Sequence, residues 1–420
     1  MKTVTVAWKA VFAASMLALP LSPLLAQEIP LGEPALFLRS NDKFAANLLC
    51  ITHEENTDRN IVLAPLPVSI SFAALLDGTV DSKSMDELSS ALNLGTGDLE
   101  IPSRMLLARF AKPKPTRPFP GKIVGGIPNF TPPLPPGKPE ELWLSAAFLY
   151  RGPGYMSQYF VDRVKERFGL EFRAVGLKTT QSEILQQTWD PALPMPVVTG
   201  PHDFWITSST HLRSGWAGNT FRSRREKLDF TVRSGKVMQA DFLKSELGAY
   251  SHVQTDDFEA VALPCNQASI LLVLPAPGRD IRQLEAALAK DPDLAEHLLR
   301  RGAGDIQLPP FHFSNDVDLQ KSLESMGVHR IFTDLSTLNG MVPGVGAILH
   351  GVVQRTEITV DDDGIRADSG TIMAGVYGGI MGGLPKSFHM VLNRPFIFII
   401  RDNATHALLF LGAVMNPTVS

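Results

Sequence analysis

Few residues in this 420-residue sequence combine the types and spacing that a chemical site needs. Asp361-Asp362-Asp363 could bind a divalent cation, but the run lacks the alternating ligands and terminal glutamate of a calcium loop. Three successive aspartates are more typical of a solvated turn. Cys265 has no defined base beside it and precedes an apolar run, which indicates a structural thiol. No His-Glu-x-x-His pair, Gly-x-Ser-x-Gly elbow or phosphate-binding loop occurs. We therefore expect no metal, no cofactor and no enzyme activity.

Composition narrows the remaining classes of protein. The 39 basic residues nearly balance the 43 acidic ones, which argues against a nucleic-acid binder that neutralises phosphates. Hydrophobic residues make up 44% of the chain, enough for a large core. Two cysteines, Cys50 and Cys265, cannot build a disulfide framework or a cysteine-based zinc site, and whether they pair is open. The length alone would suit two or three domains.

Residues 1–26 have the layout of a secretory signal peptide. Lys2 and Lys9 flank the start of an uncharged run rich in Ala, Leu and Val, and the small Ala26 precedes polar residues. The alternative is an N-terminal membrane anchor, but Pro20 and Pro23 shorten the apolar run below a spanning length. We expect cleavage and export to the extracellular space or periplasm, with no membrane association afterwards.

Periodicity predicts both helices and strands. A capping box at Ser84-Met85-Asp86-Glu87 begins one helix, and apolar stripes predict two more at Tyr159–Gly169 and Asn315–Met326. Continuous apolar runs predict three strands, the last two joined as a β-hairpin through Asp402-Asn403: Ala268–Leu274, Val391–Ile400 and His406–Met415. Helices dominate the first half and strands the second, which favours an α+β fold.

Two further segments do not fit regular elements. Lys112–Lys138 contains nine prolines, so it predicts an extended surface insertion. Gly364–Gly383 is rich in glycine and poor in large side chains, between strand-like sequence and Pro385. A long loop of this kind in a compact domain is functional or disordered.

The C-terminal third resembles the serpin signature. Asn393-Arg394-Pro395-Phe396 opens a long apolar hairpin that closes at Asn416-Pro417, and Asn60–Pro65 and Leu212–Trp216 match other family segments in order. The resemblance covers residues 34–418, so we expect one serpin domain over 27–420, of the bacterial secreted type. It implies an α+β serpin fold with three β-sheets, eight or nine helices and an exposed reactive-centre loop.

Resemblance to serpins implies a monomeric, cofactor-free inhibitor of a serine, or alternatively cysteine, endopeptidase. The protease attacks the loop as bait and forms an acyl-enzyme, and the cleaved loop then inserts into the main sheet and traps it. The alternative is a non-inhibitory serpin-fold protein that is a protease substrate, a carrier or chaperone-like.

The hinge and loop are assigned by the same resemblance to residues 362–386. Hinge positions are Asp362, Asp363, Gly364, Ile365, Arg366, Ala367, Asp368, Ser369, Gly370 and Thr371. Alternate residues of an inserted strand face the core, so Ile365, Ala367, Ser369 and Thr371 would point inward. Arg366 and Asp368, which depart from the family's alanine-rich pattern, would point to solvent.

Counting fourteen residues on from the hinge glycine places the scissile bond at Gly378-Gly379. Counting back from Pro395 places it nearer Leu384-Pro385, and we prefer the forward count because hinge-side length governs trapping. Tyr377 or Met381 would suit a chymotrypsin-like protease, and the small residues around them an elastase-like or subtilisin-like one. No Lys or Arg lies between Thr371 and Pro385, so a trypsin-like target is not expected.

Serpins keep a polar cluster of two hydroxyl residues, an Asn and a His where the strands of the main sheet part. The matching positions in this sheet-opening region are Ala64, Pro67, Ser208 and Gln354, and all four differ from the family. Trp216 matches the family tryptophan at the top of the main sheet. Sheet opening would therefore depend on another network of contacts, or be impaired.

Overall fold

The protein is described by a computed structural model, which covers residues 33–54, 57–95, 109–111, 140–151, 156–175, 204–218, 220–344, 346–349, 352–367 and 388–419. The predicted signal peptide and the Pro-rich segment lie outside these residues. So do the scissile-bond candidates and hinge residues 368–371.

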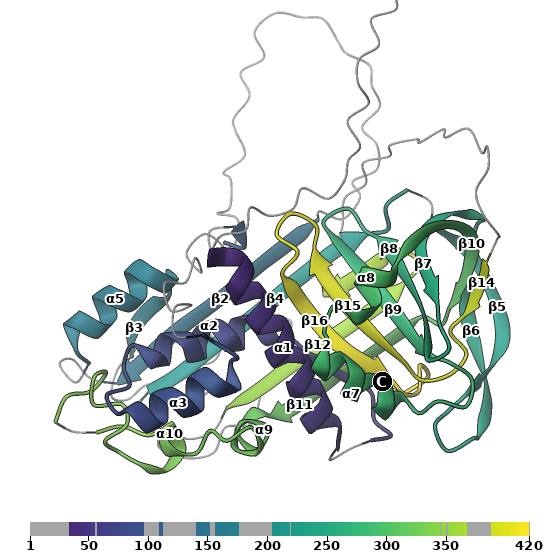
Figure 1. The fold of residues 1–420 in the computed structure, drawn as a ribbon. Helices are drawn as coiled ribbons and strands as arrows, with labels where there is room; N and C mark the ends of the chain where they lie inside the picture. Colours follow the sequence, from purple (N-terminus) through teal and green to yellow (C-terminus); the bar gives the residue numbers. More distant parts are fainter. Residues whose placement is uncertain are drawn as a thin grey trace, which may run out of the picture.

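Eight helices lie within the described residues, mostly toward one end of the molecule (Figure 1). They are α1 (Glu33–Glu54), α2 (Pro65–Leu76), α3 (Ser82–Ala91), α5 (Gln158–Phe168), α7 (Ile281–Lys290), α8 (Leu294–Leu298), α9 (Leu319–Ser325) and α10 (Arg330–Thr333). The predicted Tyr159–Gly169 helix is confirmed as α5, because Ser157 caps its first turn and Gly169 ends it at φ +64°. None of the described helices is long and apolar enough to span a membrane.

A six-stranded sheet, which we call the main sheet, carries the predicted hinge. Its strand order is β11 (Phe311–Asp318), β12 (Val353–Asp361), β13 (Gly364–Ala367), β4 (Phe204–Gly215), β2 (Glu141–Arg151) and β3 (Glu171–Val175). Neighbours are antiparallel except β2 and β3, which pair in parallel. The hinge strand β13 therefore lies in the interior of this sheet, between β12 and β4.

A ten-stranded sheet forms the other half of the molecule. Its strands, in spatial order, are β1 (Ile61–Leu63), β16 (Leu408–Val414), β15 (Phe396–Asp402), β9 (Ala268–Pro275), β8 (Phe258–Pro264), β7 (Gly248–Gln254), β10 (Arg300–Leu308), β6 (Val237–Ser245) and β5 (Phe221–Thr231), with β14 (Phe388–Val391) paired to β10. The resemblance to serpins implied three sheets. Because β7 pairs with β10, two of those three are joined here into one continuous sheet. The α+β class is confirmed.

The two sheets meet in a single hydrophobic cluster. Phe311 of β11 contacts Phe396 and Phe398 of β15, with ring centroids 6.0 and 5.4 Å away. The predicted hairpin is confirmed, because β15 and β16 pair antiparallel and are buried along their whole length. In Figure 1, α1 (dark purple) crosses in front of the strands, and it packs on both α2 and β16. The core thus ties the C-terminal hairpin to the edge of the main sheet.

Three predicted boundaries were wrong. α3 starts at Ser82 because Asp81 accepts from the Ser84 amide (3.0 Å), whereas the Ser84 hydroxyl lies 3.3 Å from that of Thr337. The predicted helix at Asn315 begins only at Leu319, after Asp318 caps it, and the preceding residues pair with β12 as β11. The run Val391–Ile400 is two strands, β14 and β15, separated around Pro395, which lacks an N–H for the ladder.

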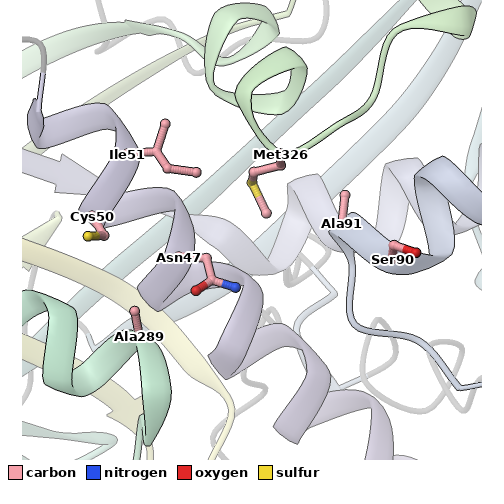
Figure 2. A pocket seen from close by; sticks show the side chains of 7 residues that line it. All are labelled: Asn47, Cys50, Ile51, Ser90, Ala91, Ala289 and Met326. Carbon is pink, nitrogen blue, oxygen red and sulfur yellow. The ribbon is translucent and has the colours of Figure 1, made fainter.

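Both cysteines are free thiols, so they do not pair. Cys265 is buried, and burial raises the pKa of its thiol, which keeps it protonated as a structural residue should be. Cys50 lines a cavity of about 290 Å³ (Figure 2). Asn47 and Ile51 of α1, Ala91 of α3 and Ala289 of α7 also line this cavity, and the pKa of the Cys50 thiol is raised mainly by burial.

A buried arginine ties α1 to the end of β15. The guanidinium of Arg401 contacts three carboxylates, those of Asp42 (2.6 Å), Glu296 (2.5 Å) and Asp293 (3.0 Å). Three negative groups share one positive charge, and Asp42 is only 5% exposed. Burial, with Asp293 and Glu296 adding to it, raises the pKa of Asp42 from its ordinary 3.8 to about 6.

This raised pKa makes a testable contribution to stability. The folded state takes up the Asp42 proton at higher pH than the unfolded state does, so this group favours folding more as the pH falls from about 7 toward about 4. We expect about 1 kcal/mol of added stability between pH 7 and pH 5 from this carboxyl. Urea unfolding of wild type and Asp42→Asn at both pH values should show that increment only in the wild type. An identical pH dependence in both proteins would contradict the assignment.

Candidate functional site

The hinge begins with a tight turn between β12 and β13. The Asp363 amide donates to Asp361 Oδ1 (2.9 Å), which closes the turn over Asp362. Gly364 follows with φ +139°, in the left-handed region that favours glycine. A Cβ there would lie 2.4 Å from the carbonyl oxygen of Ser214, so no other residue fits without moving β4. The turn therefore depends on the glycine that the sequence resemblance assigned to the hinge.

After the turn, β13 enters the main sheet. Ile365 lies opposite Val360 of β12 on one side and Ser214 of β4 on the other. Its side chain is 1% exposed and belongs to the hydrophobic core. β13 continues to Ala367, which is in register with Leu212. Hinge residues 364–367 thus already form a central strand.

Charged residues surround the hinge turn on its solvent side. Arg366 contacts both Asp361 and Asp363, the second at 3.2 Å. Arg225 of β5 contacts Asp362 across the junction between the two sheets, and this hydrogen bond raises the pKa of the Arg225 guanidinium. The three aspartates that could suggest a cation site are therefore engaged by two arginines. Within the described residues no cluster of His, Cys, Asp or Glu could hold a metal ion.

Trp216 links the two strands that border β13. It follows β4 directly, and its indole N–H donates to the Asp361 carbonyl at the end of β12 (2.8 Å). The ring also packs edge-on against Phe221, with centroids 5.0 Å apart, and its backbone bridges to Cys265. Trp216 therefore holds the end of the main sheet where the hinge enters, and it is 7% exposed.

Of the four divergent sheet-opening positions, two come together. Gln354 of β12 accepts from the Ala64 amide (3.0 Å) and donates to the Ala64 carbonyl (2.8 Å), so one side chain satisfies both backbone groups at the start of α2. Pro67 lies in the first turn of α2, where its carbonyl accepts from the Ser71 hydroxyl. Ser208 lies in β4 opposite Ala146 of β2, and its strand is separated from Gln354 by β13 in the strand order.

A second amide, which the sequence comparison did not single out, works in the same way. Asn315 of β11 accepts from the Val62 amide (2.8 Å) and donates to the Val62 carbonyl (3.1 Å). Two neighbouring strands of the main sheet are thus each tied by an amide side chain to the start of the chain's first strand and helix pair, β11 to β1 itself and β12 to the residue before α2. Asn315 is a polar residue on the otherwise apolar face that Phe311, Phe313 and Val317 form, and this was the available signal, although its partner is more than 250 positions away.

We expect the Gln354 contacts to stabilise the native state measurably. Gln354→Leu keeps the bulk but leaves the buried N–H and C=O of Ala64 without partners, at a cost of about 1–3 kcal/mol. Urea unfolding should show a lower midpoint with an unchanged slope. Gln283→Leu, at an exposed position on α7, is the matched control and should be neutral. Equal midpoints for Gln354→Leu and wild type would show that this bridge is dispensable.

Comparisons with known proteins identify the family. The family described as Serpin (serine protease inhibitor) matches residues 39–417, and the chain belongs to it. Serpin-Z7 of Hordeum vulgare is 25% identical over 273 residues, 60% of this chain and 67% of that protein. Serpin I2 of Homo sapiens is 23% identical over 50% of this chain and 53% of its own length. Alpha-1-antitrypsin of Sus scrofa is 32% identical over 155 residues, 36% of this chain and 34% of that protein.

Solved structures show that the fold is the serpin fold. Human thyroxine-binding globulin in complex with its hormone superposes with a TM-score of 0.70 at 19% identity, covering 92% of this chain and 100% of that one. The thermophilic serpin tengpin, in its native state, gives a TM-score of 0.71 at 15% identity, covering 90% and 94%. The expected fold family is therefore confirmed.

Proposed function

We propose that this chain is a secreted, monomeric serpin that inhibits a serine endopeptidase, or a cysteine one, by trapping its acyl-enzyme. The protease nucleophile attacks a carbonyl in the reactive-centre loop, the peptide bond breaks, and the chain up to that carbonyl becomes an ester or thioester of the protease. The freed loop then extends β13 along the gap between β12 and β4. The chain itself catalyses nothing and needs no cofactor.

One observation carries the proposal, namely that the first hinge residues form a central strand with Ile365 buried. A hinge that already pairs on both sides with β12 and β4 gives the rest of the loop a template for insertion. Further insertion would lengthen the existing backbone pairing of β13 with β12 and β4, so no new strand pairing has to be started. The proposed inward positions Ser369 and Thr371 are small enough for the same face of the sheet.

The alternative is a serpin that serves as protease substrate, carrier or chaperone. It is favoured by one feature, the contacts of Arg366 with Asp361 and Asp363, which restrain the hinge where the family has small residues. These contacts lie on the solvent side of the sheet, where a strand can lengthen without breaking them. We therefore prefer inhibition.

Inhibition kinetics with a panel of proteases test the proposal. We expect progressive, irreversible loss of activity with chymotrypsin-like, elastase-like or subtilisin-like proteases, and none with a trypsin-like one, because no Lys or Arg lies between Thr371 and Pro385. Cleavage should fall near Tyr377, Gly378 or Met381. Loop cleavage by every protease with full protease activity retained would exclude inhibition and leave the substrate or carrier alternative.

The proposed export rests on the sequence of residues 1–26. Expression of the full chain in a secreting host should yield a mature protein that begins close to Gln27, as N-terminal sequencing would show. A protein that keeps Met1 and stays with the cells would contradict a cleaved leader.

A further inference from the structure

The two strands that border the hinge each carry a threonine on the core face, just beyond the last described residue of β13. Along β12, Ile358 and Thr356 are successive buried residues of this face, and Thr356 is 5% exposed. Along β4, Leu212 is fully buried, and Thr210 comes two residues earlier, so the alternation of a strand puts it on the same face. β13 pairs with β4 as far as Ala367. The two threonines are therefore the next core-facing residues along its path.

Both threonine hydroxyls are buried without a partner. Among the residues that the structure describes, neither Oγ1 of Thr210 nor Oγ1 of Thr356 has a hydrogen bond. A neighbouring hydroxyl on the same face of β4 is engaged, because Ser214 Oγ accepts from the Gln267 amide (2.8 Å). A buried hydroxyl that lacks a hydrogen bond costs free energy. The two threonines therefore raise the free energy of the uncleaved protein.

The register of β13 shows which loop residue would meet these hydroxyls. Ile365 lies opposite Val360 of β12 and Ser214 of β4. Both neighbours are antiparallel to β13, so each step along the loop moves one residue back along each of them. Four residues beyond Ile365, Ser369 comes opposite both threonines at once. The even number of steps keeps it on the core face.

A serine between two threonines can satisfy both of them. Its hydroxyl has one donor and two acceptor lone pairs, so it can donate to one threonine while it accepts from the other. Residues directly opposite each other on neighbouring strands have Cβ atoms about 4.5–5.5 Å apart, a spacing at which serine and threonine hydroxyls bond. An alanine at position 369 would fill the space and leave both threonine hydroxyls without a partner.

We propose that Thr210 and Thr356 form a receiving site for Ser369, whose hydroxyl bonds to both when the cleaved loop lengthens β13. This inference rests on the proposed function and names the sheet residues that favour insertion. The hydrogen bonds form only in the inserted state, so they speed insertion relative to release of the protease. Ser369 is thus a positioning residue for trapping, because it acts through the sheet and not on the protease.

Calorimetry of intact and nicked protein tests the site without requiring a protease to be inhibited. A metalloprotease hydrolyses through a metal-activated water and forms no acyl-enzyme, so it can nick the loop beyond Thr371, with the bond identified by mass spectrometry. The nick should raise the unfolding temperature of the wild type. Ser369→Ala should leave the intact protein unchanged but reduce that rise by about 4 °C, because both threonine hydroxyls stay unpaired.

Thr356→Val should act with opposite signs on the two forms. The intact protein should unfold about 1–2 °C higher, because a buried hydroxyl without a partner is replaced by a methyl group, and the rise on nicking should shrink by about 2 °C. Adding Thr356→Val to Ser369→Ala should reduce the rise no further, since the serine is the shared partner. Thr359→Val is the matched control. Thr359 already lies opposite Arg366 in the uncleaved chain, so the rise should be unchanged.

The outcomes separate the receiving site from the proposed function. A wild-type rise that Ser369→Ala and Thr356→Val both retain in full would overturn the site and leave loop insertion in place. An equal reduction in Thr359→Val would assign the effect to general loosening of β12, which also overturns the site. No rise in the wild type would overturn insertion, and the receiving site with it.

Discussion

Ile365→Arg should convert the protein from an inhibitor into a substrate. Ile365 is buried in the core face of the main sheet, between Val360 and Ser214. An arginine there would either bury an unpaired charge, at a cost of several kcal/mol, or hold the hinge out of the sheet. Insertion would then be slower than release of the protease. We expect the number of inhibitor molecules consumed per protease inhibited to rise at least about tenfold, a shift of about 1.4 kcal/mol between the two outcomes.

The matched control for Ile365→Arg is Arg366→Gln. Arg366 is the next residue, but it lies on the solvent side and contacts aspartates of the turn. Inhibition should survive this change nearly intact, since exposed ion pairs contribute about 0–1 kcal/mol. Unchanged inhibition by Ile365→Arg would show that the register of β13 has no role in trapping. Equal loss in both variants would assign the effect to the turn and not to the buried face.

Cleavage within the reactive-centre loop should raise the unfolding temperature of the protein. In the uncleaved chain the loop is tethered at both ends, to β13 and to β14, so it cannot extend far into the main sheet. After cleavage the β13 side is free to lengthen, adding ladder hydrogen bonds and apolar contacts on both neighbours. We expect calorimetry to show that the unfolding temperature rises by more than about 10 °C. This rise corresponds to a gain of about 5 kcal/mol in the free energy of unfolding, because each kcal/mol raises the unfolding temperature by about 2 °C.

A control separates insertion from cleavage itself. Ile365→Arg, nicked at the same bond, should gain much less thermal stability than the nicked wild type. If the nicked wild type melts at the temperature of the intact protein, the loop does not insert. The chain would then be a serpin-fold protein without the trapping mechanism.

Local sequence patterns were sufficient for elements whose signals lie within a few residues. The apolar stripe and Gly169 of α5 predicted that helix within a residue, and the hairpin of β15 and β16 follows from two apolar runs around Asp402-Asn403. The boundary errors arose where a local signal competed with a distant one. Residues 315–318 have helical spacing, but pairing with β12 over the whole of β11 makes them a strand.

The site residues also fall into two groups, those that a short sequence motif predicts and those whose contacts depend on distant parts of the chain. The resemblance placed the hinge at the turn that depends on Gly364, because the turn is a short motif. The sequence showed that Ala64 and Gln354 differ from the family but not that Gln354 bonds both backbone groups of Ala64. Trp216 was likewise assigned to the top of the main sheet, whereas its bond to the Asp361 carbonyl needed the fold. Such contacts join residues separated by 145 to 290 positions, and no local pattern records them.

The mass of the denatured complex shows whether this chain traps a protease covalently. The chain should be incubated with an elastase-like or chymotrypsin-like protease, denatured, and examined by gel electrophoresis and mass spectrometry. We expect an SDS-resistant species with the mass of the protease plus the chain up to Gly378, and a released peptide that begins at Gly379. Nicked chain alone, beside free and fully active protease, would contradict it.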